Sequence, residues 1–232
     1  MARLLLVRHG QASFGAEDYD ALSPLGHEQA LVLGRSLAAR GIKPALVLRG
    51  TMRRHEETLS GILDGLGSAV PTVCDPGWNE FDFQHVVEIH RPAYRDRSAM
   101  LAELALSDRP DRAFQEVFDA ATVRWSSGRH DAEYIESFSA FRTRVAAALS
   151  EVTTLLAQHR DILAVSSGGP IAMAAALITA GPEFPAPLWA SFNRVSVNTG
   201  VTKVIAGRGG LSLSTFNEHT HVESDSRLLT YR

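Results

Sequence analysis

A short apolar run that ends in two strongly polar residues and a glycine constrains this chain most. The run covers residues 4–7, and Arg8, His9 and Gly10 follow it directly. Four consecutive apolar residues predict a strand that is buried on both faces, as in a parallel sheet. Arg8 and His9 therefore stand where that strand leaves the core. Gly10 lacks a Cβ, which lets the backbone turn sharply or approach a ligand closely.

An imidazole beside a guanidinium suits an anion-binding site that contains a nucleophile. A neutral imidazole such as that of His9 can attack phosphorus. The guanidinium of Arg8 can bind phosphate oxygens through a planar, two-pronged contact. For an isolated Arg-His-Gly triplet the alternative is an ordinary surface turn, so the rest of the chain has to decide between the two.

A helix and a second strand are predicted after this turn. Ser23 has a hydroxyl that can cap a helix, and Pro24 suits the first helical position. Gly41 predicts the end of that helix. Residues 44–48 then predict a second buried strand.

The next predicted helix carries a second candidate arginine. Thr51 is a plausible N-cap for a helix over about residues 52–66, which places Arg54 in its first turn. Free backbone N–H groups favour an anion there. The alternative is a surface ion pair between Arg54 and Glu57 at i+3, worth a few tenths of a kcal/mol.

A strand, a glycine turn and a helix recur later in the chain. Residues 161–165 predict a buried strand, and residues 166–170 read Ser-Ser-Gly-Gly-Pro. Pro170 is expected to open an alanine-rich helix that ends near Gly181. Such a unit presents backbone N–H groups to an anion, so it predicts the second half of a phosphate pocket.

The remaining segments show helical and strand patterns without candidate phosphate-binding residues. Residues 84–136 are mostly helical in pattern, with an apolar stripe between Pro110 and Gly128. Residues 138–156 predict a long amphipathic helix. Residues 195–215 predict two strands, with Asn198-Thr199-Gly200 interrupting the first and residues 207–210 between them. The stripe consists of Phe114, Phe118, Ala121 and Trp125.

Composition excludes several classes of function. The net charge is −3 without a basic run, which argues against a nucleic-acid or anionic-membrane partner. Cys74 is the only cysteine, so an internal disulfide or a cysteine-based metal site is excluded. The N-terminal apolar run is too short for a signal peptide, and no stretch approaches the roughly 20 apolar residues of a membrane span. A cytoplasmic protein is expected.

A histidine-rich stretch raises the question of a metal. His85, Glu88 and His90 lie close together in the sequence. Their spacing is not that of the zinc motif with histidines at i and i+4, so dispersed surface residues are expected and no metal site is predicted.

The alternation of strands and helices predicts one three-layer α/β/α domain over residues 1–232. Its central sheet is expected to be mostly parallel, with a helical insertion over about residues 84–136 that covers the site. Ligands bind such sheets at the carboxyl ends of the strands. Residues 8–10 and 166–169 are expected to meet there.

The motifs, taken in order, resemble those of the histidine phosphatase superfamily, also called phosphoglycerate mutase-like proteins. A single triplet is weak evidence, whereas an ordered set that spans nearly the whole chain is specific. The matching segments are RHG at residues 8–10, LSPLGHEQA at 22–30, TMRRHEET at 51–58, WNEFDF at 78–83, ESFSAFRTRV at 136–145, VSSGGPI at 165–171 and FNEHTHVE at 216–223.

The resemblance implies a phosphatase that works through a phosphohistidine on His9. Arg8 and Arg54 would bind the phosphoryl oxygens, and Glu80 would protonate the leaving oxygen. Asp82 and an ordinary solvated role for Glu80 are the competing interpretations. Substrate contacts are also expected at Gln11, Ser167 and Gly168. No metal or organic cofactor is implied, because arginines and amides supply the positive charge.

One position departs from the family pattern. Ser167 stands where the superfamily normally has a second histidine, and a neutral hydroxyl predicts reduced activity. A catalytically idle protein that binds phosphate ligands remains open for this reason. A mutase is disfavoured because residues 11–15 read QASFG where mutases resemble Glu-Ser-x-Trp-Asn. The expected partner is a small phosphorylated substrate or inorganic phosphate; the sequence identifies neither the substrate nor the oligomeric state.

Overall fold

The computed structural model describes residues 2–13 and 20–231. The chain forms two compact units. Unit 1 comprises the residues up to Glu80 and those from Val145 onward, and unit 2 comprises Phe81–Arg144.

Unit 1 is built on a six-stranded sheet in the order β3-β2-β4-β1-β5-β6. β1 pairs in parallel with β4, and β2 pairs in parallel with both β4 and β3. β5 is antiparallel to β1 and to β6, so the sheet is mixed but mostly parallel. The strands are β1 (Ala2–Arg8), β2 (Leu46–Arg49), β3 (Thr72–Cys74), β4 (Asp161–Ser166), β5 (Val201–Gly207) and β6 (Gly210–Glu218).

The predicted first strand is the centre of this sheet. Side chains 4–7 are at most 1% exposed. Successive side chains of a strand point to opposite faces, and Leu5 and Val7 pack with Leu163 and Val165 of β4 in one apolar cluster. Residues of the first two helices complete that cluster, which explains why Leu5 and Val7 are apolar.

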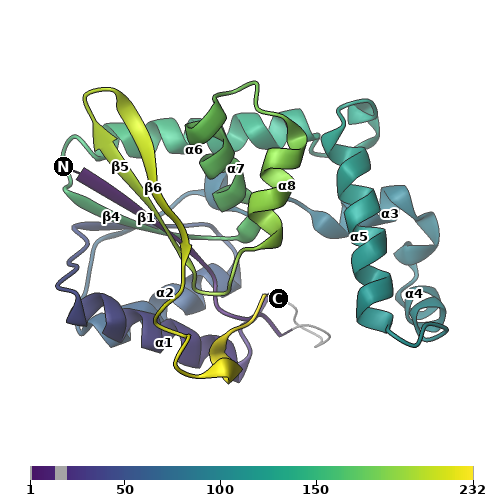
Figure 1. The fold of residues 1–232 in the computed structure, drawn as a ribbon, viewed down its shortest axis with the longest axis horizontal. Helices are drawn as coiled ribbons and strands as arrows, with labels where there is room; N and C mark the ends of the chain where they lie inside the picture. The colour runs from purple at the N-terminus through teal and green to yellow at the C-terminus, as the bar shows by residue number, and fades with distance from the viewer. Residues whose placement is uncertain (1, 14–19, 232) are drawn as a thin grey trace. The chain divides into compact units, whose positions relative to one another are not determined.

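Helices cover both faces of the sheet (Figure 1). α1 (Pro24–Ala39) and α2 (Arg53–Leu66) lie on one side, and α7 (Gly168–Ala180) and the unit 1 part of α6 (Phe138–Leu155) lie on the other. α8 (Ala186–Arg194) packs beside α7. The fold is therefore the predicted α/β sandwich with a mostly parallel central sheet.

The predicted limits of α1 are confirmed by its capping. Ser23 Oγ accepts a hydrogen bond from Gly26 N at 3.1 Å, and Pro24 occupies the first turn. Gly41 follows the C-cap with φ of +67°, a left-handed conformation that glycine adopts at little cost.

Two predicted helix starts are wrong. α2 begins at Arg53 with Met52 at the N-cap, because Thr51 Oγ1 instead accepts a hydrogen bond from Asn79 Nδ2 at 2.7 Å. α7 begins at Gly168, so Pro170 is its third residue and not its first. Proline is tolerated there because N–H groups of the first turn lack an intrahelical acceptor.

The predicted interruption at residues 198–200 is confirmed, but residues 195–197 before it are not a strand. Residues 195–200 do not extend the sheet, because Gly200 N bonds back to Val197 O at 3.0 Å and Thr199 has φ of +59°. This turn brings Thr199 N within 3.1 Å of Arg8 O. β5 starts after it, at Val201.

Unit 2 is helical. Trp125 is its central side chain: it stacks on Phe81 at 4.6 Å between ring centroids, and its Nε1 donates to Glu136 O at 2.9 Å. The helix predicted between Pro110 and Gly128 is confirmed as α5. The other helices here are α3 (Phe83–His90) and α4 (Arg97–Leu104), with α5 spanning Pro110–Ser126. In the part of the chain that the structure describes, 3₁₀ helices are found at Pro76–Trp78, Pro92–Arg95, Asp131–Glu133 and Ser226–Leu228.

Over residues 2–13 and 20–231, no helix is both long and apolar enough to cross a bilayer.

Candidate active site

His9 lies immediately after β1 and is held by its own backbone. His9 N donates to Ser166 O at 2.9 Å, and Asn198 Nδ2 donates to His9 O at 3.1 Å. The ring Nδ1 lies 2.7 Å from Gly10 O. A carbonyl only accepts, so Nδ1 carries the proton and Nε2 carries the lone pair.

The surroundings of His9 favour its neutral form. Its side chain is buried, and this burial lowers the pKa of the imidazole well below its ordinary value. The positive charges of Arg54 and Arg8, and the neighbouring His55, lower the pKa further. His9 is therefore an uncharged imidazole with a free lone pair at neutral pH.

Gly10 is required by packing against α1. A Cβ at residue 10 would lie within 3.0 Å of the Gly26 backbone. Gly10 N donates to Thr58 Oγ1 at 3.0 Å, and Thr58 Oγ1 donates to Arg54 O at 2.6 Å. The loop after β1 is thus fixed to both α1 and the first turn of α2.

Arg8 is half-buried at the end of β1. Its Nη1 donates to Ser196 O and, at 3.0 Å, to Tyr231 O. A Cβ at residue 168 would lie 3.6 Å from Arg8 Nε, so the start of α7 lies beside this guanidinium. The two segments that were expected to meet, residues 8–10 and 166–169, are adjacent.

Arg54 is 5% exposed, in the first turn of α2. Its Nη1 donates to Asp20 Oδ1 at 2.6 Å, and the other oxygen of Asp20 accepts from Arg53 N at 2.7 Å. Glu57, which the sequence offered as an alternative partner, is bound by Arg53 at i+4. A carboxylate thus contacts the guanidinium that the resemblance assigns to phosphate.

Glu80 contacts the N-terminus of α7. Its Oε2 accepts a hydrogen bond from Gly169 N at 3.2 Å, a position where helix N–H groups favour a negative charge. Asp82, the competing carboxylate, caps α3 by accepting from His85 N at 2.9 Å. Glu80 is thus the carboxylate of unit 1 that contacts the start of α7.

Ser167 is fully buried and hydrogen-bonded to a histidine that the sequence analysis did not single out. Its Oγ lies 2.8 Å from His55 Nε2. The His55 ring is 5.9 Å from that of His9, centroid to centroid. The only sequence signal for His55 is its place next to Arg54 in the matching TMRRHEET segment.

Gln11 ties the loop to the start of α1. Its Oε1 accepts from Ser23 Oγ at 2.9 Å, and its N–H donates to Gln29 Oε1 at 2.8 Å. The comparison with mutase loops also used Phe14 and Gly15, which lie outside the described residues.

The histidines considered as metal ligands have other partners or roles. His85 Nε2 accepts from Ile135 N at 3.2 Å, and Glu88 accepts from Gln84 Nε2 at 2.8 Å. Within residues 2–13 and 20–231, no three His, Cys, Asp or Glu side chains come together as a metal ion would require.

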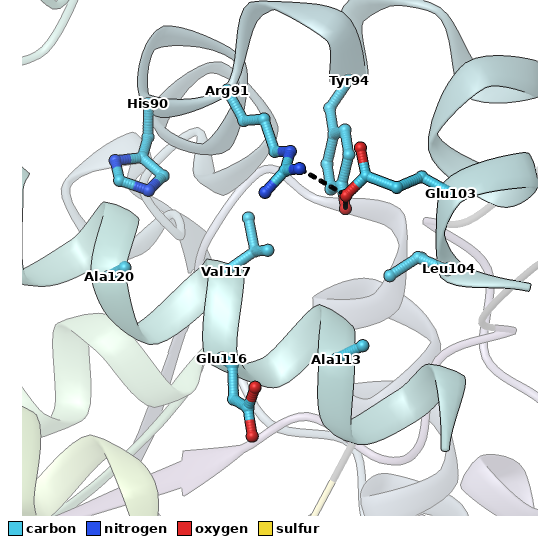
Figure 2. Close-up of a pocket in the computed structure, with 9 residues that line it drawn as sticks. All are labelled: His90, Arg91, Tyr94, Glu103, Leu104, Ala113, Glu116, Val117 and Ala120. Atoms are coloured by element: carbon cyan, nitrogen blue, oxygen red, sulfur yellow. Dashed lines mark hydrogen bonds and ion pairs between the residues drawn. The ribbon is translucent and has the colours of Figure 1, made fainter. Parts of the chain in front are cut away.

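Unit 2 has a hollow of its own, lined by the residues labelled in Figure 2. Arg91, Tyr94 and Glu103 converge on one side of it. Arg91 is paired with Glu103 at 2.6 Å, and Tyr94 donates to the same carboxylate at 3.1 Å. Glu116 adds a second carboxylate. The two carboxylates of this hollow do not favour a phosphate group, whereas the arginines of the site at the ends of β1 and β4 do.

Comparison with known proteins identifies the family. The sequence profile of the histidine phosphatase superfamily, branch 1, matches residues 4–219. The chain belongs to this superfamily. The matched range includes Arg8, His9, Arg54, Glu80 and Ser167.

Similar curated proteins are 2,3-bisphosphoglycerate-dependent phosphoglycerate mutases. That of Chelativorans sp. is 36% identical over 87 residues, which cover 34% of this chain and 42% of the mutase. That of Sinorhizobium fredii is 38% identical over 88 residues, with coverage of 34% and 41%. The chain thus spans about two fifths of the length of the curated relatives it matches.

Similar solved structures include both phosphatases and mutases. A phosphoserine phosphatase variant from Entamoeba histolytica, in complex with phosphoserine, has a TM-score of 0.65 at 18% identity, covering 96% of this chain and 100% of that one. The phosphoglycerate mutase of Bacillus anthracis scores 0.66 at 18% identity, with 95% of each chain covered. A mycobacterial glucosyl-3-phosphoglycerate phosphatase, in complex with vanadate, scores 0.61 at 20% identity, with coverage of 94% and 100%. At these identities the likeness establishes the fold.

Proposed function

We propose that this protein hydrolyses phosphomonoesters through a phosphohistidine on His9 Nε2. One observation carries the proposal: a buried, neutral imidazole has its Nδ1 proton bound to Gly10 O and its Nε2 lone pair available, next to two arginines. A neutral imidazole is the nucleophilic form, and guanidinium groups neutralise the oxygens of the phosphoryl group it attacks.

The reaction has two balanced steps. In the first, Nε2 of His9 forms a bond to phosphorus, the ester P–O bond breaks, and protonated Glu80 gives its proton to the leaving alcohol. In the second, Glu80 takes a proton from water, the water oxygen bonds to phosphorus, and the P–N bond breaks to release inorganic phosphate. Arg8 and Arg54 bind the non-bridging oxygens throughout, and phosphate displaces Asp20 from Arg54.

The N-terminus of α7 supplies the remaining contacts. Gly168 lies beside Arg8, and its N–H and that of Gly169 belong to a first helical turn, which favours an anion. Ser167 offers one neutral hydroxyl where the resemblance implies a second histidine. We therefore retain the prediction that turnover is lower than in typical relatives.

We also propose that residues 1–232 form one histidine phosphatase-type domain in which the helical segment is an insertion. The relatives that contain phosphoserine and vanadate support a small phosphorylated substrate or phosphate as the ligand. No metal or organic cofactor takes part in the proposed steps.

The test is an assay of p-nitrophenyl phosphate and a panel of phosphometabolites with wild type and His9→Ala. Wild type should release phosphate, and His9→Ala should lose this activity while keeping its fold. His159→Ala is the matched control, since His159 precedes β4 at the end opposite Ser166. Activity in His9→Ala refutes the phosphohistidine mechanism. Binding of phosphate without any turnover by wild type instead supports the idle binder.

A further inference from the structure

A second imidazole lies buried beside the proposed nucleophile, and the two steps above do not use it. His55 is fully buried in the first turn of α2, with its ring centroid 5.9 Å from that of His9. Burial, together with the charges of Arg54 and Arg49, lowers the pKa of His55 well below its ordinary value. His55 is therefore a neutral donor and acceptor of hydrogen bonds.

Ser167, its partner, does not bond as a serine at a helix N-cap usually does. Such a hydroxyl accepts from the N–H of the second or third helical residue. In α7 the third residue is Pro170, which has no N–H, and the second is Gly169, whose N–H donates to Glu80. Ser167 makes no capping bond and contacts His55 Nε2 at 2.8 Å instead.

The position of the His55 proton follows from its other nitrogen. Nδ1 is buried and has no hydrogen-bond partner among the described residues. Orphaned buried N–H groups are rarer than under-satisfied acceptors, so the proton belongs on Nε2. Nε2–H then donates to Ser167 Oγ, which leaves the Ser167 hydroxyl proton available for another acceptor.

The backbone around His55 makes room for the imidazole. A Cβ at residue 50 would overlap His55 Nδ1 and would lie 2.6 Å from Asn79 Oδ1. Asn79 Oδ1 is itself fixed, because it accepts from Thr51 N at 2.7 Å. Gly50, at the end of β2, is thus the residue that lets the ring reach Ser167.

We propose that His55 is a positioning residue, which donates to Ser167 Oγ and so directs the Ser167 hydroxyl to donate to an oxygen of the transferring phosphoryl group. This inference rests on the proposed function. The neighbours of Ser167 support it: Ser166 O binds His9 N, and Gly168 lies beside Arg8. The residue before Ser167 therefore contacts the nucleophile, and the residue after it lies beside a phosphate-binding guanidinium. A hydroxyl that accepts one hydrogen bond becomes a stronger donor in the next.

The first test compares two substitutions of His55 in the hydrolysis of p-nitrophenyl phosphate. His55→Leu fills a similar volume without a donor, whereas the side-chain amide of His55→Gln can still donate to Ser167. We expect kcat to fall about tenfold in His55→Leu, as one hydrogen bond of about 1.4 kcal/mol requires, with KM within about twofold. His55→Gln should recover most of this loss. Equal losses of kcat in both variants, or no loss in either, overturn the inference.

The second test asks whether His55 acts through Ser167. In a Ser167→Ala background, His55→Leu should lower kcat no further, because the hydroxyl it directs is gone. An undiminished effect in that background overturns the inference, since a general packing role would act in both backgrounds.

A third measurement does not depend on turnover or on the folding of a variant. Nitrogen-15 NMR of the wild-type protein at neutral pH should find the His55 proton on Nε2, and a proton on Nδ1 overturns the inference. Should wild type lack turnover, the proposed hydrolysis fails by itself. Vanadate affinity then replaces kcat: it should fall about tenfold in His55→Leu and recover in His55→Gln, and an equal affinity in all three proteins overturns the inference.

Discussion

Replacement of Glu80 by glutamine should slow the enzyme according to the leaving group of its substrate. Glutamine keeps the shape of glutamate, and its side-chain oxygen can still accept the hydrogen bond from Gly169 N that now measures 3.2 Å. The substitution therefore removes the transferable proton and leaves the contact to α7. Stability should change by less than about 1 kcal/mol, because this hydrogen bond is retained.

The size of the effect depends on how much protonation the leaving oxygen needs. A positioned general acid contributes about 10²–10⁴-fold, so kcat/KM for an alkyl phosphate such as glycerol phosphate should fall at least about a hundredfold. The p-nitrophenolate anion leaves without a proton, so kcat/KM for p-nitrophenyl phosphate should fall by less than about fivefold. Hydrolysis of the phosphoenzyme should slow as well, because Glu80 is also the base for water.

The assay measures kcat/KM for both substrates and the pre-steady-state release of p-nitrophenol. Glu80→Gln should show a burst equal to the enzyme concentration, since the phosphoenzyme accumulates. Asp82→Asn is the control: asparagine caps a helix about as well as aspartate, so the cap of α3 is kept, and the leaving-group dependence should not change. An equal fall of kcat/KM for both substrates in Glu80→Gln refutes the role of Glu80 as the acid.

Three further predictions concern the phosphate-binding Arg54, the buried histidines and the close packing of Gly10 against Gly26. Arg54→Ala should cost roughly 3 kcal/mol of transition-state stabilisation, about a hundredfold in kcat/KM, and a loss confined to KM would contradict this. The unfolding free energy measured by urea titration should fall as the pH drops below about 6.5, because the unfolded chain takes up protons that the folded histidines exclude. The fall should reach up to about 1.4 kcal/mol per pH unit for each buried histidine. An unfolding free energy that does not change between pH 7 and pH 5 would contradict this prediction. Gly10→Ala should destabilise by about 1–3 kcal/mol through overlap with Gly26, whereas Gly209→Ala, which meets open space, should stay within about 0.5 kcal/mol. The buried histidines are His9 and His55, whose pKa values lie well below the ordinary value. The half-buried His221, whose pKa is lowered mainly by burial to about 4, adds to the effect.

Local signals explain what the sequence predicts well. The apolar run of β1 and the capping of α1 by Ser23 are properties of a few neighbouring residues, and both are confirmed. Competing local signals explain the errors. Pro170 and Thr51 each suit a helix start by residue type, but the chain uses Thr51 to bind Asn79 and begins α7 two residues before Pro170.

The contacts that define the site depend on sheet order, which no local pattern contains. His55 and Ser167 are 112 residues apart in the sequence and meet because β4 lies between β2 and β1. The contact of Arg8 with Tyr231 O spans 223 residues. Sequence motifs nominate the polar residues of the proposed site, whereas the partners that hold those residues required the structure.

The most direct test of the mechanism is to trap the phosphoryl group on the protein. Brief reaction with a phosphorylated substrate, followed by alkaline quenching and mass spectrometry, should find a phosphate on His9 that is stable in base and lost in acid. His9→Ala should carry none, and His159→Ala should carry as much as wild type. A phosphate on another residue, or turnover without any phosphoenzyme under conditions that slow its hydrolysis, as in Glu80→Gln, would contradict the account.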